Sequence, residues 1–174
     1  MATFDMTAKS TAGVDSNSIA VLPSARNKTY LAETILDIAK LVTAGTFSTV
    51  SNGDIFQVLE IPAGTVVIAA GAEVLTAWDG SSPTVDIDFA EGDDIVDGGD
   101  VSSTGFLASG TAGGANEPSA TTYTHFQSAT DTIDVKVVAA SSDVAVGILR
   151  VYAICCDLTG VADNADEVDR DQLA

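Results

Sequence analysis

Short segments of alternating apolar and polar residues, separated by turn signals, constrain the fold of this chain most strongly. The clearest is residues 84–89 (TVDIDF), in which Val85, Ile87 and Phe89 fall on one face of an extended chain and two aspartates on the other. The preceding Asp79-Gly80 pair predicts a turn. The side-chain period of a strand is two, so this pattern predicts a strand with one apolar face.

Other segments repeat this pattern along the chain. Pro62 and Gly64 predict a turn between two strands, and Gly71 is expected to separate the next two. Residues 29–41 fit both a helical stripe and strand alternation, and the all-β context favours a strand. Loops are expected at residues 45–53, 91–99 and 108–120. Further strands are expected at residues 54–60, 65–70, 73–78, 106–107, 132–139 and 147–158, the last being long, apolar and central.

Composition supports an all-β fold class. Lys, Arg, Glu and Gln, on which long exposed helices draw, are scarce, whereas small β-tolerant residues and turn formers dominate. The length of 174 residues predicts one domain. We therefore expect a jelly-roll-like β-sandwich at residues 28–159. An extended arm (1–27) should precede it, held by a neighbouring subunit or by its own domain, and a short acidic tail (160–174) with a short helix near Asp166 should follow it.

The distribution of charge excludes several partners. Between Leu41 and Val135 there is no Lys or Arg, while fourteen Asp and Glu lie in that stretch, and the net charge is −18. Binding to phosphate or nucleic acid normally needs fixed positive charge. We expect no nucleic-acid partner and no membrane partner. A saline habitat, assembly onto a less acidic partner, and a surface that simply favours solubility remain open explanations.

The start of the chain and its cysteines bear on location. Residues 1–18 lack the apolar core of a signal peptide, and no run of about 18 apolar residues is present. Cys155 and Cys156 are adjacent, so on a strand they would point to opposite faces. We expect two free thiols, one buried and the other facing a partner or solvent, which suits synthesis in a reducing cytoplasm.

A dense acidic segment is the best candidate for a metal site. Several carboxylates on a flexible loop could bind Ca²⁺, with Asp93 and Asp94 as the strongest candidates, although the spacing does not match an EF-hand. The favoured alternative is a solvated acidic loop without an ion. No other cofactor is expected. The cluster comprises Asp86, Asp88, Glu91, Asp93, Asp94, Asp97 and Asp100.

Catalytic constellations are weak, and we expect no enzyme and no catalytic residues. His125 has no nucleophile or orienting acid nearby in sequence, which favours a surface or interface role. Glu60 and Glu73 could act as a carboxylate pair, but such sites usually bring aromatic sugar platforms that this chain lacks. The paired glycines are not followed by the Lys of a phosphate loop. Trp78 is expected to serve packing.

Two segments resemble a pattern in structural proteins of tailed bacteriophages. The first is IPAGTVVIAAGAEVLTAWDGSSPTVDIDFAEGDD, residues 61–94, with its Pro-Ala-Gly turn and its Trp-Asp-Gly turn. The second is LRVYAICCDL, residues 149–158, a closing strand with an aliphatic–Tyr–aliphatic run. The resemblance spans roughly residues 54–158. Proteins with this pattern decorate or cement capsids or build head fibres.

The resemblance implies a role and partners. It implies a β-sandwich subunit on the capsid surface of a virion, assembled symmetrically as a homo-oligomer, with a trimer as one arrangement. It also implies contact with the major capsid protein or other virion proteins. The alternative is a receptor- or glycan-binding module at a fibre tip. A third reading, a surface-layer or Ca²⁺-dependent adhesive domain, would call for a secretion signal.

Overall fold

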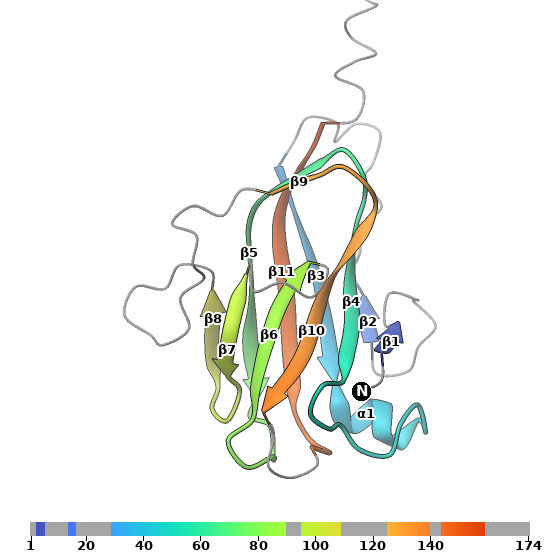
Figure 1. The fold of residues 1–174 in the computed structure, drawn as a ribbon, viewed down its shortest axis with the longest axis vertical. Coiled ribbons are helices and arrows are strands. Elements are labelled where there is room, and N and C mark those ends of the chain that lie inside the picture. The colour runs from blue at the N-terminus through green and yellow to red at the C-terminus, as the bar shows by residue number, and fades with distance from the viewer. Residues whose placement is uncertain are drawn as a thin grey trace, which may run out of the picture.

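The computed structural model describes residues 3–5, 14–16, 29–89, 95–108, 125–139 and 144–158. These residues form two β-sheets packed face to face, with one short helix at one end (Figure 1). The expected all-β sandwich is therefore confirmed. In Figure 1, β6 and β10 of one sheet cross in front of β5 and β11 of the other.

The first sheet, sheet A, has the strand order β1-β4-β10-β6-β7. Its first pair, β1 and β4, is parallel, and the remaining pairs are antiparallel. The strands span Thr3–Asp5 (β1), Ile55–Ile61 (β4), Asp131–Ala139 (β10), Thr84–Phe89 (β6) and Val96–Asp100 (β7).

The second sheet, sheet B, has the order β2-β3-β11-β5-β8, with β9 also paired to β5, and all its pairs are antiparallel. The predicted closing strand β11 lies in the middle of this sheet, as expected. The strands span Val14–Ser16 (β2), Thr29–Asp37 (β3), Ile148–Asp157 (β11), Thr65–Thr76 (β5), Gly105–Ala108 (β8) and His125–Gln127 (β9).

The core lies between the two sheets. Alternate residues of the central strands point inward, so Leu36 and Val151 of sheet B pack in the same buried cluster as Phe56, Ile87 and Val135 of sheet A. All five side chains are fully buried. Burial of apolar area at roughly 25 cal/mol per Å² is the main force that holds two such sheets together.

The segment 29–41, for which a strand was favoured, is a strand only as far as Asp37. From there the chain forms helix α1 (Ile38–Thr43). The Asp37 side chain accepts a hydrogen bond from the Lys40 backbone N–H at 3.0 Å, which caps the helix start. Ile38 and Leu41 are the buried residues of α1. The apolar residues of this segment therefore lie first on a strand and then on a helical turn.

Two further predictions about strand boundaries are wrong. Gly71 does not break a strand: it lies inside β5, opposite Tyr152 on one side and Ala108 on the other. Part of the predicted loop at 91–99 is strand β7, which pairs with β6. In both cases pairing on a neighbouring strand overrides the local preference of glycine for turns. The turn at Gly64 is confirmed, with φ of 81°.

The segments predicted to flank the sandwich are described only in part. Residues 3–5 and 14–16 form short strands at the outer positions of sheets A and B. The predicted tail and its helix near Asp166 lie outside the described residues. Within the described part, no helix has the length and apolar character needed to cross a bilayer.

Candidate functional site

The predicted Ca²⁺ candidates, Asp93 and Asp94, lie outside the described residues. Asp97 and Asp100 of the same cluster are exposed on β7. Within the described ranges, no group of three or more His, Cys, Asp or Glu side chains is arranged to hold a metal ion. The Ca²⁺ site stays a prediction that rests on sequence.

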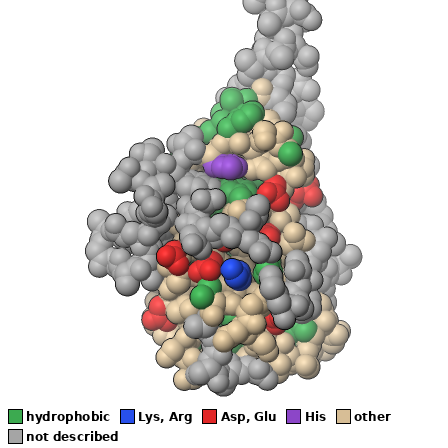
Figure 2. Space-filling view, viewed as in Figure 1, with side chains coloured by type: hydrophobic (Ala, Val, Ile, Leu, Met, Phe, Trp, Pro, Cys, Tyr) green, Lys and Arg blue, Asp and Glu red, His purple; other side chains and the backbone are tan. Residues whose placement is uncertain are grey.

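The outer face of sheet A carries acidic side chains in register. Asp134 of β10 lies directly opposite Asp88 of β6, and Lys136 lies opposite Asp86. The three carboxylates are buried although they alternate with the core residues of their strands. Figure 2 shows acidic side chains on the side of the molecule where β6 and β10 lie in front. For Asp86 and Asp88 the description as a solvated loop is wrong, because both are buried on a strand.

Hydrogen bonds engage the carboxylates of Asp86 and Asp134. Asp86 Oδ1 accepts from the Gly98 N–H at 2.9 Å, which ties β6 to β7. Asp134 Oδ1 accepts from the Thr132 hydroxyl at 2.6 Å. A buried acceptor that receives such bonds avoids much of the cost of leaving water. The arrangement holds strands in register rather than presenting an acid–base pair.

The other residues considered as site candidates are not arranged as a catalytic site among the described residues. His125 stacks on Phe89, with ring centroids 4.7 Å apart, and its Nε2 lies 2.8 Å from Gln127 Oε1. Trp78 is buried, as predicted for a packing role. Glu60 and Glu73 lie on strands of different sheets, so the structure does not bring them together as a carboxylate pair.

The outer face of sheet B is the most prominent surface feature of the described chain. On it, apolar side chains line up across neighbouring strands: Leu31 of β3 lies opposite Ile154 of β11, which lies opposite Ala69 of β5. Leu31 and Ile154 are 47% and 36% exposed. We call this surface the sheet B face. It comprises Leu31, Glu33, Ile35, Val66, Ala69, Glu73, Phe106, Phe126, Arg150, Tyr152, Ile154 and Cys156.

Two phenylalanines extend the sheet B face at its border. Phe126 of β9 lies opposite Val66 and is 56% exposed, and Phe106 of β8 lies opposite Glu73 and is 63% exposed. Large apolar side chains gathered on one face of a monomer typically mark a contact with another molecule. Sequence analysis missed this surface. The sequence feature that indicates this surface is the apolar run of β11, which places apolar residues on both faces of the strand.

A small charge network lies within the sheet B face. Arg150 pairs with Glu73 on β5 and, at 3.7 Å, with Glu33 on β3. Its side chain is 35% exposed, so solvent and salt weaken both pairs. Burial raises the pKa of the neighbouring Tyr152 hydroxyl above its ordinary value. Apart from this network, the described side chains of the face are uncharged.

The two cysteines behave as predicted: both are free, and they point to opposite faces. Cys155 is fully buried in the core, and burial raises the pKa of its thiol to about 11. Cys156 is half-buried on the sheet B face, opposite Thr29 and Val66. Its position gives a thiol reporter for that face, while Cys155 reports on the core.

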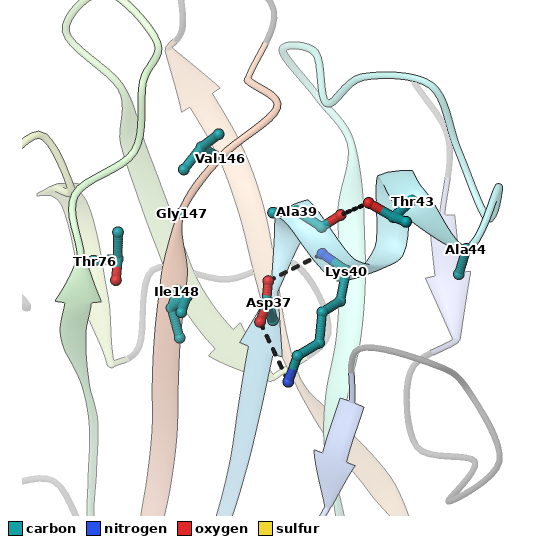
Figure 3. A pocket seen from close by; sticks show the side chains of 9 residues that line it. All are labelled: Asp37, Ala39, Lys40, Thr43, Ala44, Thr76, Val146, Gly147 and Ile148. Atoms are coloured by element: carbon teal, nitrogen blue, oxygen red, sulfur yellow. Dashed lines mark hydrogen bonds and ion pairs between the residues drawn. The ribbon is translucent and has the colours of Figure 1, made fainter.

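A groove of about 490 Å³ lies beside α1 (Figure 3). Its volume is within the range of small-molecule sites. The Asp37 carboxylate, however, already caps α1 and pairs with the Lys40 ammonium at 3.5 Å. Polar groups to orient a ligand are therefore few. The groove is lined by Asp37, Ala39, Lys40, Thr43, Ala44, Thr76, Val146, Gly147 and Ile148.

No family model and no curated protein matches the chain. Two solved structures are similar to it. One is a chain of the capsid of Ralstonia phage GP4, with 20% identity and a TM-score of 0.48, covering 78% of this chain and 88% of that one. The other is a chain of the acidic stable capsid of Helicobacter pylori bacteriophage KHP30, with 21% identity and a TM-score of 0.38, covering 72% and 86%. Both TM-scores are below 0.5, so neither likeness by itself assigns a function.

Proposed function

We propose that this chain is a structural subunit of a tailed-phage virion, which decorates or cements the capsid by contact with copies of itself and with the major capsid protein. The observation that carries the proposal is the exposed, largely apolar sheet B face on a rigid sandwich. A subunit that functions alone would gain little from such a surface, whereas a subunit of an assembly buries it.

The sequence resemblance supports the same role through its place in the fold. Residues 61–94 contain β5 and β6, and residues 149–158 make up nearly all of β11. These segments are far apart in sequence, but β11 pairs with β5 over almost its whole length. Of the parts that resemble phage structural proteins, β5 and β11 therefore lie side by side in sheet B and contribute to the middle of the sheet B face, while β6 lies in sheet A.

Charge supports assembly on a surface less acidic than the chain itself. At a net charge of −18, the protein repels other strongly acidic surfaces at low salt. Binding to a capsid shell with a less acidic outer surface relieves that repulsion. Burial at each contact then adds to the stability of the bound fold, because a partner that binds only the folded state shifts the folding equilibrium.

Co-sedimentation tests the proposal. The purified chain is incubated with undecorated phage capsids and pelleted, with fully decorated capsids as the control. The expected result is saturable binding at a fixed number of copies per undecorated capsid and little binding to decorated ones. Absence of saturable binding, combined with binding of the monomer on a glycan array, would instead support the receptor-binding alternative.

A further inference from the structure

We propose that the sheet B face is the contact between two copies of this chain, which pack back to back with their sheet A faces outward. This inference rests on the proposed function and deepens it, because it names the surface through which the virion subunit associates with itself. The partner on this face is a second copy of the same chain, in an isologous two-fold arrangement.

The first argument is the pattern of β11. Its inward residues, Leu149, Val151 and Ala153, are fully buried in the core. Its outward residues include Ile154 and Tyr152, which in the single subunit face outward from the sandwich. Strands that are apolar on both faces are typical of sheets covered on both sides. Among the described residues, sheet A covers only the inner face of β11, and a second copy of the chain would cover its outer face.

The second argument is charge. Two copies with a net charge of −18 each repel one another, so they can approach only through a surface that is poor in carboxylates. On the sheet B face the two described glutamates flank Arg150 and are partly neutralised by it, and Asp15 lies opposite Ile35 on the edge strand β2. The outer face of sheet A carries Asp86, Asp88 and Asp134 instead. Back-to-back packing keeps those carboxylates at the greatest distance from each other.

The third argument is area. Strands lie about 4.8 Å apart and rise about 3.3 Å per residue, so the face measures about 20 Å across, side chains included, and about 25 Å along β3. That is a projection of about 500 Å² per copy. Two copies together bury about 1,000 Å², which just reaches the area that separates specific contacts from chance ones. Because this lies at the lower end of the range, we expect a dimer that dissociates at micromolar concentration.

The geometry of the face fits a two-fold axis. β11 is the middle strand of the sheet, so an axis through the centre of the face passes near β11. Packed sheets align their strands within about 30° or cross them at right angles, and either arrangement satisfies a two-fold axis. The half-exposed guanidinium of Arg150 would then meet carboxylates from both copies, which fixes the register of the contact.

Sedimentation equilibrium of the full chain, without capsids, tests the inference. The variant Ile154→Asp places a charge in the centre of the face, and Leu31→Thr trims an apolar side chain while keeping a strand former. The matched control is Val138→Asp, which alters a side chain of similar exposure (42%) on β10 of sheet A. Far-UV circular dichroism and urea unfolding establish that each variant is folded.

The expected result is a reversible dimer for the wild type and for Val138→Asp. The dissociation constant should rise on the order of 100-fold in Ile154→Asp, and to a smaller extent in Leu31→Thr. A wild type that stays monomeric up to 1 mM protein (about three decades above a micromolar constant), a trimer, or equal weakening by Val138→Asp would each overturn the inference. If Ile154→Asp does not fold, Leu31→Thr decides between these outcomes.

The outcomes separate this inference from the proposed function. A wild type that dimerises but does not bind undecorated capsids retains the inference and refutes the virion role. A wild type that binds capsids at saturating levels but never dimerises retains the virion role and refutes the inference. In that second case another partner covers the sheet B face.

Discussion

Substitution of Gly147 by Ala should destabilise the fold strongly, because it introduces both backbone strain and a steric clash with a buried side chain. Gly147 has φ of +154°, a conformation that L-residues rarely adopt. A Cβ atom at this position would lie 2.2 Å from Cδ1 and 2.7 Å from Cγ of the buried Trp78 ring. The Gly147 carbonyl also accepts a hydrogen bond from the Ile38 N–H at 3.0 Å, which limits how far the backbone can move.

The chain contains a matched control for the backbone part. Gly105 has φ of +157°, and a Cβ there would meet nothing within 4 Å. Gly105→Ala should therefore cost only the backbone strain, about 1–2 kcal/mol. Gly147→Ala adds the forced displacement of a packed indole, about 1–3 kcal/mol more, for a total of about 2–5 kcal/mol. The difference between the free energies of unfolding of the two variants therefore measures the cost of the clash with Trp78.

Urea unfolding followed by far-UV circular dichroism measures both free energies of unfolding, since the fluorescence of Trp78 would report on the altered site itself. The expected result is a clearly lower midpoint for Gly147→Ala than for Gly105→Ala, with similar slopes. If the two variants unfold at the same urea concentration, Trp78 does not pack against Gly147 as described. The reasoning about this contact would then be refuted.

Four other outcomes follow from the structure. Asp37→Ala should lower the free energy of unfolding by about 1 kcal/mol through loss of the α1 cap, whereas Lys40→Ala should cost less than half of that, as measured by urea unfolding. Iodoacetamide at pH 8 should modify Cys156 and spare Cys155 until the chain is unfolded, and peptide mass mapping that finds equal modification would contradict the burial. The pKa of the Cys155 thiol is raised from 9.0 to about 11, so the unfolded chain loses this proton first. Stability that is fully present below pH 9 should therefore decline between pH 9 and 11, and less so in Cys155→Ala. Arg150→Met should cost about 1 kcal/mol at low salt and less in 1 M NaCl, because its ion pairs are partly exposed.

The strands that could be predicted are those whose period shows in the sequence. Thr84–Phe89 alternates cleanly, and it forms β6 with the expected side chains in the core. Gly71 was misjudged because its conformation is set by pairing with β11 and β8, which no local pattern reveals. Asp37 was missed as a helix cap because a strand and a helix share one apolar run there.

The candidate surface was less predictable than the fold. Leu31, Ile154 and Phe126 come from three strands that are distant in sequence, and they meet only through the registers of β3, β11 and β9 with their neighbours. The buried position of Asp86 and Asp88 was hidden for the same reason: alternation predicts which face a residue lies on, not what covers that face.

The central claim is that the sheet B face becomes buried when the protein assembles. Its most direct test is the alkylation rate of Cys156, which lies half-buried on that face, with Cys155 as the internal control. In dilute free protein Cys156 should react readily, and in dimers and on capsids its rate should fall on the order of tenfold as access is lost. An unchanged rate for Cys156 in the capsid-bound protein would contradict the account.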